Sequence, residues 1–250
     1  MSQRKNLQLK WSRDTKPVLT VRQDPKVTFD CLDCSNGQIL PSSTPADILE
    51  LNPELGNPIF SPVSIIGVEP ADVLEVEFIR LEPAGELWGF SAVIPGFGLL
   101  GDEFQTPDLR VYSVSSDKKY VVFKDGIYIP LLPFLGIVGV APGEPEGSGT
   151  IPSLDIGGNV DCNHLTEGMK TYLPVHVPDA NLSCGDGHAA QGDGEVCGTA
   201  IEVSMTATLK FKVQRKCRMS LTPITTLVAL FIVMRMLKEE VMQRWVLAQI

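Results

Sequence analysis

The clearest hydrophobic pattern in the chain is the alternation of apolar and polar residues between positions 199 and 213. Its apolar members share one face of an extended strand: Ile201, Val203, Met205, Ala207, Leu209, Phe211 and Val213. Shorter β-forming runs predict further strands at 17–33, 63–67, 73–81, 88–94, 111–114, 120–123, 127–129 and 171–177. The pattern predicts a mainly β fold, a β-sandwich or distorted barrel, with one short helix near residues 46–51.

Two segments lack this alternation. Residues 131–140 are apolar but contain Pro133 and Gly136, which favours a buried extended segment over a helix. Between residues 156 and 193 glycine and polar residues dominate, apart from the strand at 171–177. Taken alone, the run Gly185–Glu195 predicts a polar, glycine-rich loop.

The C-terminal segment differs from the rest of the chain. Residues 227–234 are continuously apolar, and apolar positions recur as far as Val246. We expect a buried or amphipathic helix there, because a membrane-spanning helix needs about 20 apolar residues. A tail anchor or a membrane-surface helix is the alternative. The sequence thus divides into a main region, residues 1–213, and a helical tail, residues 214–250.

Composition and charge narrow the classes of function. With 250 residues, of which 44% are hydrophobic and 20% charged, the chain can bury a large core. Its net charge of −9 repels phosphate backbones and anionic lipid, so we expect no nucleic acid or membrane partner. Residues 1–10 are polar and do not resemble a signal peptide, which predicts a cytoplasmic location and reduced cysteines.

The cysteines offer two kinds of chemistry. Cys31 and Cys34 have the C-x-x-C spacing of redox and zinc sites, but the strand-to-helix context of the first and the second cysteine pair of the other are missing. Cys184 and Cys197 are candidate nucleophiles, although their glycine neighbours suit small packing residues equally well. We expect packing or surface thiols.

The densest group of reactive side chains lies between Gly185 and Glu195. This run holds two aspartates, one histidine, one glutamine and one glutamate among glycines and alanines. Small residues let a substrate approach the backbone, while carboxylates and imidazole bind divalent metals or transfer protons. The alternative is a solvated, acidic turn.

Three weaker candidates lie elsewhere in the chain. If residues 157–161 are extended, Asn159 and Asp161 share a face; an Asx turn is the alternative. Asp33 precedes Asn36-Gly37 and fits a plain hairpin turn. His176 lies in an apolar strand and is expected to be structural.

Several motifs, in order along the chain, resemble the acetamidase/formamidase family. The longest is the run from Ser183 to Glu202. The others are Val68–Val76, Pro95–Leu100, Pro133–Gly136 with Gly139–Pro142, Gly157–Asp161 and Tyr172–Val175. They span about residues 11–211, so the resemblance covers most of the chain and is specific.

The resemblance implies a metal-dependent hydrolase that converts short aliphatic amides to a carboxylic acid and ammonia. Its fold would be mainly β with a smaller α+β part. The matching positions imply a divalent metal, zinc with calcium as a possible second ion, held by Asp33, Asp161, Asp186 and His188. Glu195 and Gln191 would be catalytic, and Asn159 and Gly187 would contact the small amide substrate.

The chain departs from the family pattern after Val213, where we expect the resemblance to stop. A main region that is incomplete at its C-terminal end would leave strand edges exposed, which predicts low stability, impaired activity and association into a homo-oligomer. The alternative to an amidase is therefore a non-catalytic metal- or ligand-binding protein of the same fold. A serine amidase is disfavoured, because Gly147-Ser148-Gly149 lacks the context of a nucleophilic serine.

Overall fold

The computed structural model describes residues 6–22, 24–85, 87–145, 147–215, 224–227 and 230–233. As predicted, the fold is mainly β. Within the described ranges the helices are two short 3₁₀ helices, η2 (Pro45–Glu50) and η3 (Pro53–Leu55). The first of them lies where the sequence predicts a short helix.

One of the two large sheets contains the strand with the clearest alternation. Its six antiparallel strands run in the order β21-β20-β16-β7-β19-β4: β21 (Leu230–Val233), β20 (Ile224–Leu227), β16 (Lys170–Pro174), β7 (Val73–Pro83), β19 (Met205–Gln214) and β4 (Lys26–Cys31). β19 pairs with β7 along its whole length, from Met205 opposite Pro83 to Gln214 opposite Val73. Alternate residues of β19 are buried, as the sequence predicts for a half-buried strand.

The other large sheet has nine strands along its main path, in the order β11-β10-β9-β8-β18-β17-β12-β15-β14. These are β11 (Ile127–Pro130), β10 (Tyr120–Lys124), β9 (Asp108–Val114), β8 (Trp88–Val93), β18 (Ile201–Glu202), β17 (Ser183–Ala190), β12 (Phe134–Gly139), β15 (Gly157–Asn159) and β14 (Ser153–Leu154). Off this path, β5 (Ile59–Phe60) pairs with β17 and with β1 (Leu7–Gln8).

Two small sheets complete the described structure. β13 (Ser148–Gly149) pairs with β2 (Lys10–Trp11), and β3 (Leu19–Val21) pairs in parallel with β6 (Val63–Ile65).

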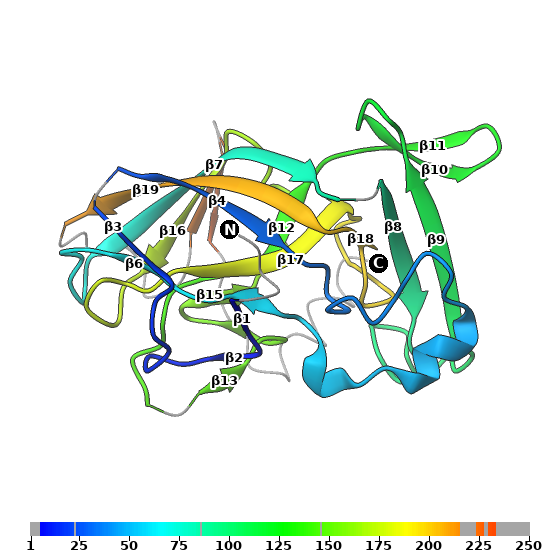
Figure 1. Cartoon of the computed structure of the whole chain (residues 1–250), viewed down its shortest axis with the longest axis horizontal. Coiled ribbons are helices and arrows are strands. Elements are labelled where there is room, and N and C mark those ends of the chain that lie inside the picture. Colours follow the sequence, from blue (N-terminus) through cyan, green and yellow to red (C-terminus); the bar gives the residue numbers. More distant parts are fainter. Residues whose placement is uncertain are drawn as a thin grey trace.

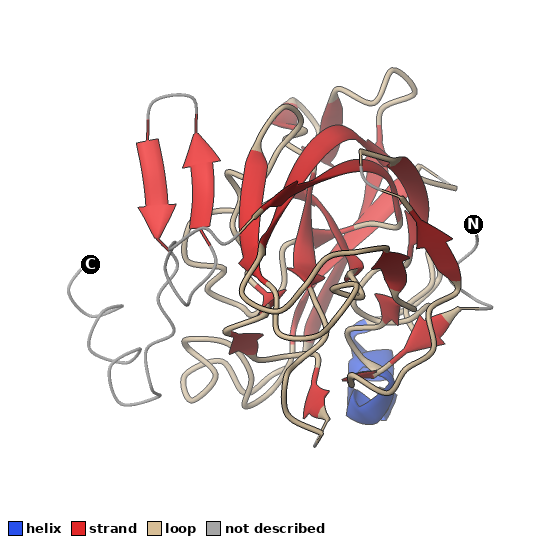
Figure 2. Cartoon of the chain, turned by 90° about the vertical axis from the view of Figure 1, so that its left-hand side faces the viewer, coloured by secondary structure: helices blue, strands red, loops and turns tan. Residues whose placement is uncertain are grey.

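The main core lies between the two large sheets. The six-stranded sheet lies over β12 and β17, while β8 to β11 extend to the other side of the molecule (Figure 1). Buried side chains from both layers form one cluster that includes Phe29, Phe78, Phe134, Ile137 and Phe211. The described strands form stacked, open layers and not a closed barrel, which decides between the two predicted architectures (Figure 2).

The expected C-terminal helix is contradicted where the structure describes this segment. Residues Ile224–Leu227 and Leu230–Val233 form an antiparallel hairpin, and β20 adds to β16 at the edge of the six-stranded sheet (Figure 2). A short apolar run fits a strand as well as a helix, and an unpaired sheet edge favours the strand. The rest of the predicted tail after Arg215 lies outside the described residues. Within them, no helix is long and apolar enough to cross a membrane.

The expected loop around residues 183–190 is also wrong, because β17 is a central strand there. Gly185 and Gly187 let neighbouring chains come close. A Cβ atom on Gly185 would lie 2.4 Å from the carbonyl oxygen of Pro58, and one on Gly187 would lie 2.4 Å from that of Val203. Glycine usually weakens strands, but here only glycine fits between the crossing segments.

Candidate functional site

Asp186 and His188 lie beside Gly136 of the neighbouring strand. β17 pairs with β12 so that Leu135 is opposite Gly187 and Ile137 is opposite Gly185. A Cβ atom on Gly136 would lie 2.6 Å from Asp161 Oδ1, 2.7 Å from Asp186 Oδ2 and 2.9 Å from His188 Cε1. The missing side chain of Gly136 therefore leaves the space in which three polar side chains converge.

Asp161 joins this group through the backbone that follows β15. The amides of Val160 and Asp161 both donate to the carbonyl oxygen of Gly136, at 2.9 and 3.1 Å. One ligand atom each from Asp161, Asp186 and His188 lies within 4.8 Å of the others, an arrangement that can hold a metal ion. The structure thus brings together three of the four residues that the sequence proposes as metal ligands.

Glu202 is a member of this site that the sequence interpretation missed. It pairs with His188 across β17 and β18, and its Oε1 lies 3.4 Å from His188 Nε2, close to the 3.3 Å that separates this nitrogen from Asp186 Oδ2. Glu202 is buried. It lies on the polar face of the 199–213 alternation, where the pattern gives no sign of burial. Its place between Ile201 and Val203, within the run that resembles the family, is the signal that could have found it.

Glu195 approaches the same histidine from the segment between β17 and β18. Ligand atoms of His188, Glu195 and Glu202 form a second group within 4.8 Å of one another. Glu195, Asp186 and Asp161 all have positive φ values, of 41°, 60° and 40°. Such a conformation costs about 1–3 kcal/mol in a non-glycine residue and is typical of functional sites.

Gln191 connects Asp161 to His188. Its Nε2 donates to the carbonyl oxygen of Asp161 at 2.8 Å, so its Oε1 faces His188 Nδ1 at 2.9 Å. Since Oε1 can only accept, Nδ1 carries the proton of this hydrogen bond. The other ring nitrogen, Nε2, is the one that faces Asp186 and Glu202.

The carboxylates shift one another's pKa values and the pKa of the histidine. Burial raises the pKa values of Asp161 and Glu202 well above the usual range, and the charge of Asp186 adds to the effect at Asp161. Burial also raises the pKa of Glu195. Burial alone would lower the pKa of His188, but the carboxylates of Glu202 and Asp186 raise it well above its usual value.

The residues present fit a divalent cation. Among the described side chains, Asp161 Oδ1, Asp186 Oδ1 and Glu202 Oε2 are buried and lack a hydrogen-bond partner. A buried, unpaired carboxylate oxygen is unfavourable unless hydrogen bonds or a cation compensate it. Several such oxygens beside one imidazole nitrogen make a donor set that zinc accepts.

Asp33 and Cys34 occupy different positions relative to this cluster. Asp33 is buried, and its Oδ1 accepts hydrogen bonds from the amide and hydroxyl of Ser35, at 3.0 and 2.5 Å. It belongs to none of the three groups of converging ligand atoms found in the described residues. Cys34 does belong to one, with Asp186 and Glu202. The two cysteines of the C-x-x-C motif therefore have different surroundings. Cys31 packs against Cys184, with 3.9 Å between the two sulfur atoms.

Asn159 and Gly187 also differ in position. Asn159 lines a cavity of about 320 Å³ together with Cys34, Asp161, Asp186, Glu195 and Glu202. Its Oδ1 is buried without a hydrogen-bond partner in the described structure. Gly187 instead lies against Val203 and Met205 and lines neither this cavity nor the larger groove beside it.

The cysteines of the described region are free thiols, in agreement with the sequence interpretation. Burial raises the pKa values of Cys34 and Cys184 well above the usual value, and the Glu202 carboxylate adds to the effect at Cys34. Cys197 donates to the carbonyl oxygen of Thr199 at 3.2 Å. Protonated thiols are poor nucleophiles, so Cys34 and Cys184 do not suit covalent catalysis.

Known proteins share both the sequence pattern and the fold. A relative from Schizosaccharomyces pombe that carries a formamidase name is 29% identical over 266 residues, which cover 83% of this chain and 64% of that protein. The acetamidase of Mycolicibacterium smegmatis is 25% identical over 254 residues, covering 78% of this chain and 62% of that protein. The crystal structure of an acetamidase from Bacillus halodurans superposes with a TM-score of 0.83 at 29% identity, covering 90% of this chain and 74% of that chain.

The chain spans less than two thirds of the length of the curated relatives it matches. The model of the Acetamidase/Formamidase family matches residues 1–145 and 144–236. The match continues beyond Val213, which corrects the expectation that the resemblance stops there. With nearly the whole described chain covered by this match, the protein belongs to the acetamidase/formamidase family.

Proposed function

We propose that this chain hydrolyses small amides to a carboxylic acid and ammonia, and that the cluster around His188 is its active site. The observation that carries the proposal is the convergence of the ligand atoms of Asp161, Asp186, His188, Glu195 and Glu202. The four carboxylates of this cluster also line one small cavity. Family membership supports the reaction class, and the buried unpaired oxygens support a need for a cation.

Asp161, Asp186 and His188 would hold the metal ion, with Glu202 beside them. The imidazole nitrogen among carboxylate oxygens favours zinc over calcium, which prefers oxygen ligands. A bound divalent ion supplies Lewis acidity, which polarises an amide carbonyl and lowers the pKa of water. Asp33 is the weakest of the proposed ligands, since Ser35 already satisfies one of its oxygens.

Glu195 is the proposed general base. The pKa of its carboxyl group is raised toward neutral pH, where a base both accepts and releases a proton efficiently. It would take one proton from water as the oxygen bonds to the carbonyl carbon, and give a proton to the nitrogen as the carbon–nitrogen bond breaks. The products are a carboxylic acid and ammonia, so atoms and charge balance.

Gln191 and Asn159 would position other groups in the active site. We assign Gln191 as a positioning residue and not as a proton donor, because its amide is used by Asp161 and His188. Asn159 has a free amide oxygen facing the cavity and suits a hydrogen bond to the substrate –NH₂ group.

Ammonia release from formamide and acetamide tests the proposal. Wild-type protein should release ammonia, and Glu195→Gln should lower kcat by about 100-fold or more, as is usual when a general base is lost. Glu103→Gln, at an exposed position, is the matched control and should behave like wild type. If the wild type, with metal supplied, releases ammonia neither from these two amides nor from larger primary amides, a non-catalytic binding protein of the same fold is favoured.

A further inference from the structure

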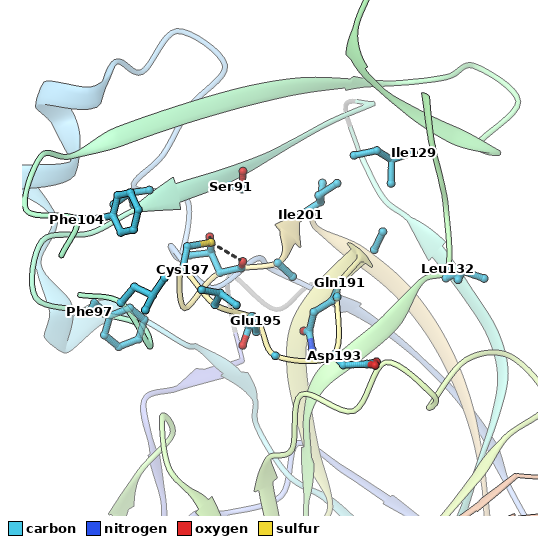
Figure 3. Close-up of a pocket in the computed structure, with 18 of the residues that line it drawn as sticks. Ser91, Phe97, Phe104, Ile129, Leu132, Gln191, Asp193, Glu195, Cys197 and Ile201 are labelled. Atoms are coloured by element: carbon cyan, nitrogen blue, oxygen red, sulfur yellow. Dashed lines mark hydrogen bonds between the residues drawn. The ribbon is translucent and has the colours of Figure 1, made fainter. Parts of the chain in front are cut away.

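A large apolar groove lies beside the proposed active site. Its volume is about 940 Å³, and its apolar walls include Phe97, Leu100, Phe104, Ile129, Leu132 and Ile201. Phe97 and Phe104 lie at one end and Ile129 and Leu132 at the other, with the segment of Gln191, Glu195 and Cys197 between them (Figure 3). Large exposed apolar patches on a protein usually mark a binding surface.

The groove and the active-site cavity share a wall. Phe97, Glu195 and Thr199 line both spaces. Glu195 also belongs to the group of ligand atoms with His188 and Glu202. The two spaces are therefore adjacent at Glu195, and the groove is the nearest large space for the part of a substrate attached to its carbonyl carbon when the amide lies at this cluster.

The volumes of the cavity and the groove suit amides of different sizes. Formamide and acetamide have only about three or four heavy atoms, so they fit within the 320 Å³ cavity and leave the groove unused. The groove alone has the volume of a site for a much larger ligand. Leu132 and Phe104, with 62% and 56% of their surface exposed, gain contact area only if something enters the groove.

The charge of the groove limits what can enter. The polar side chains that line it include Asp193 and Glu195, and none of the lining residues in the described part of the chain is basic. An anionic substituent would be repelled by these carboxylates, whereas a neutral hydrocarbon group would bury apolar surface.

We infer that the preferred substrate is a neutral primary amide with a large apolar acyl group, an aryl or alkyl chain, that occupies this groove. The inference rests on the proposed amidase function and names its substrate class. Leu132, Phe97 and Phe104 then determine specificity, and acetamide is a poor substrate because it contacts none of them.

A substrate series tests the inference on the full 250-residue chain. Values of kcat/KM are measured by ammonia release from acetamide, butyramide, hexanamide and phenylacetamide. Each added methylene that enters the groove should raise kcat/KM by about fourfold. If acetamide is hydrolysed as fast as the larger amides, the inference is overturned and the proposed function stands. If no amide is hydrolysed, both are overturned.

A matched pair of variants tests whether the acyl group of the substrate lies in the groove. Leu132→Asp puts a charge in the groove and should lower the preference for phenylacetamide over acetamide by at least about tenfold. Leu49→Asp is the control, because Leu49 is 64% exposed and lines neither space. It should leave the preference unchanged. An equal preference in Leu132→Asp and wild type would place the acyl group elsewhere and overturn the inference.

Discussion

The amide of Gln191 fixes which nitrogen of His188 faces the carboxylates. Nδ1 of His188 donates to Oε1 of Gln191 at 2.9 Å, while the Nε2 of Gln191 is held by the carbonyl oxygen of Asp161 at 2.8 Å. The neutral ring then has its lone pair on Nε2, which lies 3.3 Å from Asp186 Oδ2. Gln191 thus selects the form of the histidine that can bind a metal.

Replacing Gln191 should therefore weaken metal binding. In Gln191→Leu we expect the affinity for zinc to fall about 10- to 100-fold, as is typical when the partner of a metal-binding histidine is lost. Competition with a chromophoric chelator measures the affinity directly. Gln191→Glu keeps an acceptor for Nδ1 and should retain most of the affinity for zinc. If both variants bind zinc like wild type, Gln191 does not position His188.

Adding a methyl group at Gly136 should damage the site and the fold together. The new Cβ atom would lie 2.6 Å from Asp161 Oδ1 and 2.7 Å from Asp186 Oδ2, so these side chains must move. We expect Gly136→Ala to lower the free energy of unfolding by about 1–3 kcal/mol and to weaken zinc binding.

Gly149→Ala is the matched control for this substitution. Its Cβ atom would meet only Pro152 Cδ, at 4.0 Å, and the change in stability should stay within about 0.5 kcal/mol. Urea denaturation measures both variants. Equal stability and equal zinc affinity in the two would show that Gly136 is not required for the convergence of the ligands.

Sequence patterns identified the sheets well but failed where the site is built. β19 alternates because one of its faces is buried, and its apolar residues reveal that face. β17 has no such pattern, because its glycines are required by crossing chains, and because its Asp186 and His188 lie with the carboxylate of Glu202 in one buried polar cluster. Local rules are expected to fail at functional sites, where chemistry selects the residues.

Glu202 and Asp33 show which features of the site the sequence does not reveal. Alternation assigns Glu202 to the polar face of its segment, and the sequence does not reveal that the pairing of β18 with β17 places this buried residue opposite His188. Asp33 was assigned as a ligand through the family pattern, but Ser35 binds it locally. The low stability expected from exposed edges after Val213 stays a prediction, although β20 covers one edge of β16.

Stability should fall in acid partly through Glu75. Burial raises the pKa of this carboxyl, but hydrogen bonds from Lys170 at 2.6 Å and Gln214 at 2.8 Å outweigh burial and lower the pKa below its usual value. Because the folded state holds the charged form, its contribution is present above the unfolded pKa of about 4.3 and is lost as pH falls through the folded pKa.

Glu75→Gln should remove this contribution, about 1 kcal/mol at pH 7, and flatten the pH dependence of stability in this range. Urea denaturation between neutral and acidic pH measures it, with Glu50→Gln at an exposed position as the control. A Glu75→Gln variant with the same pH profile as wild type would show that the contacts with Lys170 and Gln214 do not stabilise the fold.

Metal content measures the central claim most directly. Elemental analysis of the purified chain, after incubation with zinc and removal of unbound ions, should find about one ion per chain, because Asp161, Asp186 and His188 form one converging site. The Asp186→Asn and His188→Ala variants should lose most of it, while Asp108→Asn, at an exposed position, should retain it. A wild-type chain that retains no metal, or that retains no more than these two site variants, would contradict the account.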